Sequence, residues 1–184
     1  MKNKIISGRR FIRLIPYFTA LTFLFFLLQC SETESPGEVV KNFYSTYLTT
    51  TASGLPGEKD LQILKPFFTS KLGSLLVNAL REQNDFINKF PDEKPPLIEG
   101  DLFSSLFEGP TNFKIADTKI NDESATVFVE FAYPDSLSDE KVFKWQDIVH
   151  LILEDKKWKI SDIEYLGKWD FALRGRLTEI LNSD

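Results

Sequence analysis

The chain of 184 residues contains one histidine, His150, and the residues around it decide whether acid–base chemistry can be expected. An imidazole works as a general acid or base when a carboxylate orients it, and Asp147 and Asp162 are the nearest candidates in the predicted strands. In a regular strand, positions 147 and 150 point to opposite faces, so this pairing would need a bulge. We therefore expect His150 to be a half-buried or surface residue. Asp162 is as well suited to capping a turn or accepting backbone hydrogen bonds as to catalysis.

Other catalytic and metal-binding patterns are missing from the sequence. With one His and one Cys, the chain can form neither a Cys/His zinc site nor a catalytic triad that needs a second His. It also has no glycine-rich phosphate-binding loop. The sequence thus predicts no metal, no cofactor and no catalytic residue, and it favours a protein that is not an enzyme.

The single cysteine, Cys30, stands at the end of an export-signal pattern. Residues 1–29 contain five basic side chains and no acidic one, and residues 14–28 form an uncharged, mostly apolar run of 15. This length is typical of a signal peptide and shorter than the ~20 residues of a bilayer span. The sequence Leu27-Leu28-Gln29-Cys30 resembles a bacterial lipobox, in which the Cys thiol receives a diacylglycerol. Gln29 replaces the usual small residue, so an uncleaved anchor helix stays open as the alternative.

These features divide the chain into three parts: a lipoprotein signal peptide (1–29), a lipidated Cys with a short tether (30–35) and a single folded domain (36–184). The five tether residues after Cys30 reach at most ~17 Å, at ~3.4 Å each, so the domain is held close to its membrane. We expect a bacterial cell-envelope protein that is attached to the membrane through a lipid anchor. Ser31 stands in place of the Asp that retains many lipoproteins at the inner membrane, and this favours the outer membrane by analogy.

The charge of the chain limits the partners that the domain can have. The whole chain has 22 basic and 27 acidic residues, and five of the basic ones lie in the signal. The remainder therefore carries 17 basic against 27 acidic residues, a net charge of about -10. Such a surface repels polyphosphate, so we expect no nucleic-acid partner and no direct binding to anionic lipid. With a single Cys, the domain can form no internal disulfide.

Sequence periodicity predicts three helices. Ser35-Pro36-Gly37-Glu38 has the pattern of a capping box with Pro at the first helical position, so a helix begins there and ends before residues 49–57. Amphipathic patterns predict a longer helix over residues 69–90 and a last one over about 170–181. Residues 91–112 have no clean period and predict a long ordered loop.

Four segments have the alternation of β-strands: residues 113–120, 125–132, 142–153 and 158–165. Asn121-Asp122 and residues 154–157 supply turns for two antiparallel hairpins, and 134–140 is a polar connection. The predicted fold class is α+β, with the N-terminal helices packed on a curved four-stranded antiparallel sheet and a C-terminal helix.

Several stretches of the chain resemble an uncharacterised domain family of small envelope lipoproteins, whose fold is similar to nuclear transport factor two and the cystatins. The stretches are the helix 38–48, the Leu72-Gly-Ser-Leu-Leu76 helix, the Gly100-Asp101 loop and the hairpin 151–163. In that family Pro follows Gly-Asp, whereas this chain has Leu102. The resemblance implies a conical α+β domain and no particular reaction, because such folds host both enzymes and binding modules.

Aromatic side chains are candidates for two different uses. One set could line a cavity between helices and sheet, although a packed interior is the simpler expectation; its members are Phe43, Tyr44, Tyr47, Phe143 and Trp145. A second set lies in the long loop and either folds down as a plug over the cone or is exposed as a docking patch. Its members are Leu102, Phe103, Leu106 and Phe107.

Two hypotheses of function follow from the sequence. The first is a lipid-anchored binding or accessory module, which docks on a membrane-proximal envelope protein complex or binds a small apolar ligand. The second is a hydrolase or isomerase that uses the cone of the fold, with His150 or an Asp acting beside Tyr44 or Tyr47. The absence of a clear catalytic pair favours the first.

Overall fold

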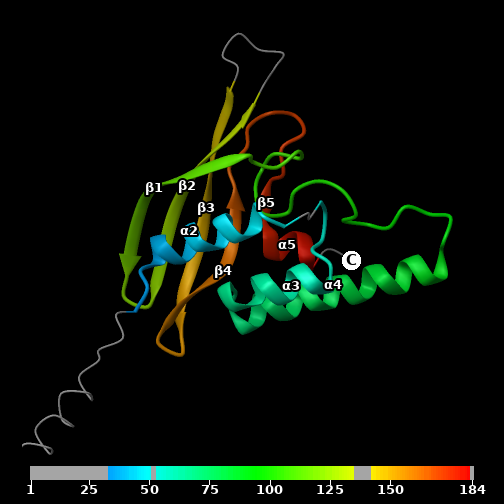
Figure 1. Cartoon of the computed structure of the whole chain (residues 1–184), viewed down its shortest axis with the longest axis horizontal. Helices are drawn as coiled ribbons and strands as arrows, with labels where there is room; N and C mark the ends of the chain where they lie inside the picture. The colour runs from blue at the N-terminus through cyan, green and yellow to red at the C-terminus, as the bar shows by residue number, and fades with distance from the viewer. Residues whose placement is uncertain (1–32, 51–52, 135–141, 183–184) are drawn as a thin grey trace, which may run out of the picture. The chain divides into compact units, whose positions relative to one another are not determined.

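The computed structural model describes residues 33–50, 53–134 and 142–182 (Figure 1). These residues belong to one compact unit, Thr33–Asp184. The predicted signal peptide and Cys30 lie outside the described residues, as does most of the predicted polar connection at 134–140. Within the described residues, no helix is long and apolar enough to cross a membrane.

The helix α2 (Pro36–Tyr47) begins where the capping pattern predicts. The hydroxyl of the N-cap Ser35 accepts a hydrogen bond from the backbone N–H of Glu38 at 3.3 Å, and the Glu38 carboxylate accepts one from the backbone N–H of Ser35 at 3.0 Å. The stripe of apolar side chains from Val39 to Tyr47 is buried, and the helix lies across one face of the sheet (Figure 1). This capped helix fixes where Tyr44 and Tyr47 point.

Two more helices follow α2, and the second of them contacts β4. They are α3 (Glu58–Leu64), continued by the short 3₁₀ helix η2 (Lys65–Phe67), and α4 (Ser70–Lys89). The side chain of Thr69 caps α4 by accepting a hydrogen bond from the backbone N–H of Leu72 at 3.2 Å. The predicted helix over 69–90 is confirmed.

The sheet has five antiparallel strands in the order β1-β2-β3-β4-β5. They are β1 (Asn112–Asn121), β2 (Ser124–Pro134), β3 (Val142–Glu154), β4 (Lys157–Tyr165) and β5 (Gly175–Arg176). The four predicted strands are confirmed. Both predicted tight turns are present, with left-handed backbone at Asp122 and at Asp155-Lys156.

The two faces of the sheet differ in burial. On β2, alternate residues from Ala125 to Phe131 are buried, whereas those between them are half-buried. β3 repeats this pattern, with Trp145, Asp147, Val149 and Leu151 buried. Because α2 contacts β1, β2 and β4, the buried face is the one that the helices cover.

The C-terminal helix is shorter than predicted. Instead of a helix over 170–181, the chain forms a loop at 166–174, the two-residue strand β5 and the five-residue helix α5 (Leu177–Leu181). Gly175 has a φ of +77°, so a right-handed helix cannot run through this residue and α5 begins after it. The Glu179 carboxylate accepts the backbone N–H of Arg176 at 2.9 Å and so fixes the helix start. β5 also adds a fifth strand to the predicted sheet.

Candidate functional site

The loop between α4 and β1 contains a segment that enters the core. Residues 101–105, here called the plug segment, are all buried although they have no regular secondary structure. Three of them, Asp101, Ser104 and Ser105, bring polar side chains into the interior. The segment also brings its backbone N–H and C=O groups, and each buried polar group needs a hydrogen-bond partner.

Asp101 folds the plug segment back on itself. Its Oδ1 accepts hydrogen bonds from the backbone N–H of Phe103 at 2.5 Å and from the hydroxyl of Tyr47 on α2 at 3.0 Å. Its Oδ2 accepts from the hydroxyl of Ser104 at 3.2 Å. Burial raises the pKa of Asp101 to about 6, although the bonds from Phe103, Tyr47 and Ser104 act in the opposite direction.

Asp147 on β3 holds the other end of the plug segment. Its Oδ2 accepts hydrogen bonds from the backbone N–H of Ser105 at 2.7 Å and from the Trp145 indole at 3.2 Å. Its Oδ1 accepts from the hydroxyl of Ser105 and from the backbone N–H of Leu166 at 2.9 Å. Burial raises the pKa of this carboxyl as well, against the effect of these bonds. Each of the two carboxylate oxygens therefore accepts two hydrogen bonds from the surrounding chain.

Two tyrosines satisfy the carbonyl groups of the plug segment. The Tyr44 hydroxyl donates to the carbonyl oxygen of Phe103 at 2.7 Å, and the Tyr165 hydroxyl donates to that of Leu102 at 2.6 Å. Burial raises the pKa of both phenols, so they remain neutral donors. Tyr44 on α2, Tyr165 on β4 and the two carboxylates form hydrogen bonds with the backbone of the plug segment. This irregular backbone can therefore lie inside the domain.

Ser105 joins the plug segment to the loop at 166–174. Its carbonyl oxygen accepts from the backbone N–H of Leu173 at 3.0 Å, and its hydroxyl accepts from that of Gly167 at 3.1 Å. We call the residues 97–111 and 166–174 the loop end of the domain (Figure 1). Its most exposed aromatic side chains are Phe107 and Phe171, which are 52% and 88% exposed.

A pocket of about 200 Å³ lies beside Asp101, between the C-terminal end of α2 and the loop end. Residues of the segments 47–53 and 100–110 line it, among them Tyr47, Asp101, Phe107 and Glu108. Glu108 is exposed and Asp101 is only 5% exposed, so one carboxylate lies at the surface and the other is deeply set.

The structure divides the four predicted docking residues. Leu102 and Phe103 are 3% and 0% exposed, so the prediction that they form a docking patch is wrong, and they act as the plug instead. The ring of Phe103 lies edge-on to Phe43 and Tyr47, with centroid distances of 5.3 and 4.9 Å. Leu102 and Phe103 can be buried because the two aspartates and the two tyrosines form hydrogen bonds with the backbone N–H and C=O groups around them. Leu106 is half-buried, and only Phe107 is well exposed.

The predicted cavity-lining residues do not share one cavity. Phe43 and Tyr44 are fully buried among other core side chains. Phe143 and Trp145 stack on each other at 5.7 Å, and the Trp169 ring meets Phe143 edge-on at 5.0 Å. Of the five residues, Tyr47 alone lines the pocket beside Asp101. The space between helices and sheet is filled by aromatic packing and the plug segment.

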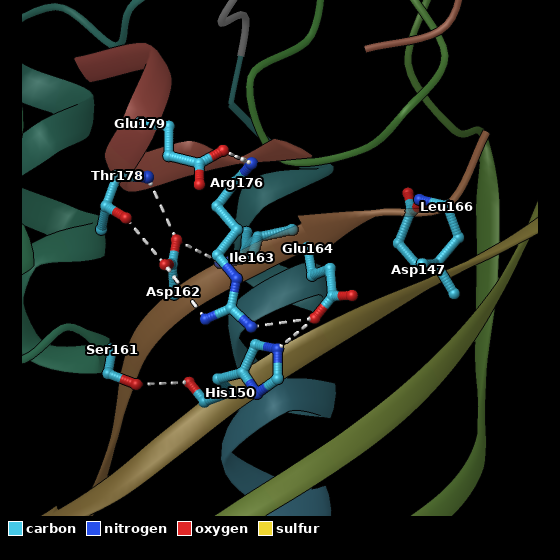
Figure 2. A network of polar contacts seen from close by, with 10 residues as sticks. All are labelled: Asp147, His150, Ser161, Asp162, Ile163, Glu164, Leu166, Arg176, Thr178 and Glu179. Carbon is cyan, nitrogen blue, oxygen red and sulfur yellow. Dashed lines mark hydrogen bonds and ion pairs between the residues drawn. The ribbon is translucent and has the colours of Figure 1, made fainter. Parts of the chain in front are cut away.

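His150 lies on the face of the sheet that the helices do not cover, as part of a polar network (Figure 2). Its Nε2 is 2.8 Å from Oε2 of Glu164, and the same oxygen accepts from Nη2 of Arg176 at 3.2 Å. Asp147 points to the opposite face, as strand alternation predicts. The register does shift between His150 and Leu151, but this shift leaves His150 on the face opposite to Asp147.

Asp162 takes the structural role that the sequence left open. Its Oδ1 accepts from the backbone N–H of Ile163 at 2.9 Å and from that of Thr178 at 3.1 Å, and its Oδ2 accepts from the Thr178 hydroxyl at 2.7 Å (Figure 2). Thr178 lies in the first turn of α5. Asp162 therefore caps this helix and attaches it to β4. In the described part of the chain, no three His, Cys, Asp or Glu side chains gather in a way that could hold a metal ion.

The residues that organise the site were only partly visible in the sequence. Asp147 interrupts the inward-facing series Phe143, Trp145, Val149 and Leu151, and a carboxylate among apolar inward positions indicates a buried hydrogen-bonding role. Ser105 and Tyr165 carry no comparable signal. Their partners lie 42 and 63 residues away in the chain, so no local pattern identifies them.

Comparisons with known proteins show that the sequence of the chain is similar to that of a lipoprotein. No protein-family model matches it. It is 26% identical over 148 residues to the uncharacterized lipoprotein YbjP of Escherichia coli (strain K12), a match that covers 80% of this chain and 76% of the relative. A crystal structure from Campylobacter jejuni, provisionally described as an NTF2-like transpeptidase, aligns with a TM-score of 0.31 and 13% identity over 71% of this chain and 94% of that one. The predicted resemblance to an uncharacterised lipoprotein is confirmed.

Proposed function

We propose that the chain is a lipid-anchored envelope protein that binds a membrane-proximal protein through its loop end, without turnover of a substrate. Its similarity to a lipoprotein supports an envelope-associated protein. Anchoring through Cys30, the outer membrane and the binding role are parts of this proposal, supported by the signal pattern of residues 1–30.

One observation carries the binding role: the plug segment fills the cone. In a fold of this kind, an enzyme needs an open interior where a substrate can meet acid and base groups. Here the two carboxylates that are buried next to the plug segment, Asp101 and Asp147, accept hydrogen bonds from it. The alternative, a hydrolase or isomerase that uses the cone, would need residues 101–105 to leave the core and both carboxylates to lose their partners.

The loop end offers a surface for a partner. Phe107 and Phe171 are exposed, and hydrogen bonds of Ser105 connect the two loops that carry them. Aromatic side chains are typical anchors of protein interfaces. The net charge of about -10 outside the signal favours a partner with a basic or apolar surface.

The tether limits where this partner can be. It reaches at most ~17 Å, and α2 with its 12 residues adds roughly 18 Å before the loop end begins. The C-terminal end of α2, against which the loop end lies, is therefore within roughly 35 Å of the membrane, and a partner bound at the loop end is close to that surface. An integral envelope protein, or one bound to it, meets this condition.

Site-specific photocrosslinking of the full chain in native membranes tests the proposal. A photoreactive residue at position 107 or 171 should give a discrete crosslinked band with one protein. The same residue at position 120 or 152 should not, because Ile120 and Ile152 are also exposed, at 59% and 41%, but lie away from the loop end. Equal crosslinking at all four positions, or none at 107 and 171, would contradict binding through the loop end.

A further inference from the structure

The pocket beside Asp101 combines a buried acid, an aromatic side wall and an acidic rim. Asp101 is nine-tenths buried or more, Phe107 is half-exposed and Glu108 is exposed. The volume of about 200 Å³ lies below the ~300–1,000 Å³ of pockets that hold whole metabolites. The pocket therefore suits one short chemical group.

One oxygen of the Asp101 carboxylate, Oδ2, lies beside a residue that lines this pocket. Oδ1 accepts two bonds, whereas Oδ2 accepts one side-chain bond, from Ser104, at the long distance of 3.2 Å. Oδ2 also lies next to Gly109, which lines the pocket, and a Cβ at this position would be 2.6 Å from it. The carboxylate also accepts the backbone N–H of Ser104, so its four acceptor sites are used and a cation in the pocket would interact with its negative charge rather than occupy a free acceptor site.

No positive group of the described chain neutralises Asp101. Its partners are a phenol, a hydroxyl and backbone N–H groups, and none of the ion pairs among the described residues includes it. A buried carboxylate without a counter-charge is unfavourable, as the raised pKa of Asp101 shows. A cation that entered the pocket would supply the missing charge.

Phe107 and Glu108 favour the same kind of ligand. Gly100 allows the Phe107 ring to lie close to the backbone, because a Cβ at Gly100 would be 2.7 Å from two ring carbons. An aromatic ring attracts an ammonium group placed over its face, by about 0.5–1 kcal/mol at exposed sites. Glu108 adds a negative charge at the entrance. Among the residues that the structure describes, no Lys, Arg or His lines the pocket.

We propose that this pocket binds an alkylammonium group, supplied either by a lysine side chain of a protein partner or by a free small amine. The inference rests on the proposed function only for the first of these sources.

Titration of the full chain in detergent micelles tests the inference, with isothermal calorimetry as the readout. The probes are n-butylammonium, the lysine derivative Nα-acetyl-lysine N-methylamide and its uncharged counterpart Nα-acetyl-norleucine N-methylamide. At pH 7.5 we expect saturable binding of at least one ammonium probe and none of the norleucine probe. Binding of the lysine derivative alone assigns the site to a partner's lysine, whereas binding of both ammonium probes assigns it to small amines.

Three variants test the residues. Glu108→Gln and Phe107→Leu should each weaken binding several-fold without a loss of fold, because both residues are on the surface. Asp101→Asn should weaken it more than tenfold. Glu123→Gln is the matched control, since it removes one exposed acid in the β1–β2 turn, outside the pocket. If Asp101→Asn fails to fold, the two surface variants still decide.

Binding should also be about tenfold weaker at pH 5 than at pH 7.5, because protonation of Asp101 competes with the cation. The other titratable groups around Asp101 are the phenols of Tyr47, Tyr44 and Tyr165, whose pKa values are raised, and Glu108 at the rim. Equal binding of charged and uncharged probes, or an affinity unchanged in both surface variants, would overturn the inference. Crosslinking at position 107 is a separate result and could persist in that case.

Discussion

Asp147 on β3 accepts hydrogen bonds from both the backbone N–H and the hydroxyl of Ser105, which lies 42 residues earlier in the chain. Irregular backbone lacks the hydrogen-bond acceptors that a neighbouring strand would supply, and the Asp147 carboxylate takes their place. It connects the sheet to the plug segment and, through Leu166, to the loop at 166–174. Asp147 thus connects both parts of the loop end to the sheet.

Removal of this carboxylate should destabilise the domain strongly. Asp147→Ala leaves the N–H groups of Ser105 and Leu166 and the Trp145 indole without their acceptor, and each unsatisfied buried donor costs about 1–3 kcal/mol. We expect a loss of about 3 kcal/mol or more in the free energy of unfolding, measured by urea denaturation. Asp147→Asn keeps one acceptor oxygen and should lose less. Asp117→Ala, at an exposed position on β1, is the control and should change the stability by less than ~0.5 kcal/mol.

Two phenylalanines in the same loop should respond very differently to truncation. Phe103→Ala removes a fully buried ring and should lower the free energy of unfolding by about 3–5 kcal/mol. Phe107→Ala removes a ring that is 52% exposed and should cost less than about 1 kcal/mol. Denaturant midpoints of the two variants check this. Similar losses in both would mean that the plug segment does not occupy the core.

Asp101 should make the domain more stable in mild acid. Its pKa is about 6 in the folded protein against 3.8 as the ordinary value, so folding favours the protonated form. The stabilisation is complete below about pH 4 and is lost as pH rises through about 6, a difference of about 3 kcal/mol from this group. Burial raises the pKa of Asp147 and acts in the same direction.

The comparison with Asp101→Asn isolates this contribution. Other carboxyls titrate over the same range, but the variant lacks only the proton uptake of Asp101. The unfolding free energy of the wild type should fall more steeply between pH 4 and pH 7 than that of Asp101→Asn. Parallel curves for the two proteins would show that Asp101 ionises normally.

The anchor is tested on the full chain. If Cys30 is acylated and becomes the mature N-terminus, the intact mass of the membrane form equals residues 30–184 plus the lipid. Cys30→Ser should abolish both processing and the lipid mass. A mature chain that begins elsewhere, or a processed Cys30→Ser protein that stays in the membrane, would contradict lipid anchoring.

The elements with local signals could be predicted from the sequence. The capping box at Ser35, the stripe from Leu72 to Ala79 and the alternation along β2 each depend on neighbouring residues, and all three were predicted correctly. The end of the last helix could not be predicted in the same way. Leucines at 173 and 177 have helical spacing, but Gly175 with its positive φ allows a strand and a turn to replace the first half.

The interior position of Phe103 depends on contacts between distant residues. An apolar loop residue can be buried or exposed, and the decision depends on whether its backbone finds partners inside. Here the hydroxyl of Tyr44 reaches the carbonyl group of Phe103 from 59 residues away, and Tyr165 reaches that of Leu102. No pattern within the loop contains this information, so the sequence left the plug and the docking patch as equal alternatives.

Residues 101–105 are buried between the helices and the sheet, and for this reason we place binding at the loop end. Hydrogen–deuterium exchange of the backbone N–H groups of Phe103 and Ser105, measured by NMR on the full chain, tests this most directly. We predict that both exchange as slowly as core amides such as those of Val127 and Val149, because carboxylate oxygens bind them in the interior. Exchange at the rate of an exposed loop, while Val127 and Val149 stay protected, would show that residues 101–105 leave the interior. That result would contradict a filled interior with binding at the loop end.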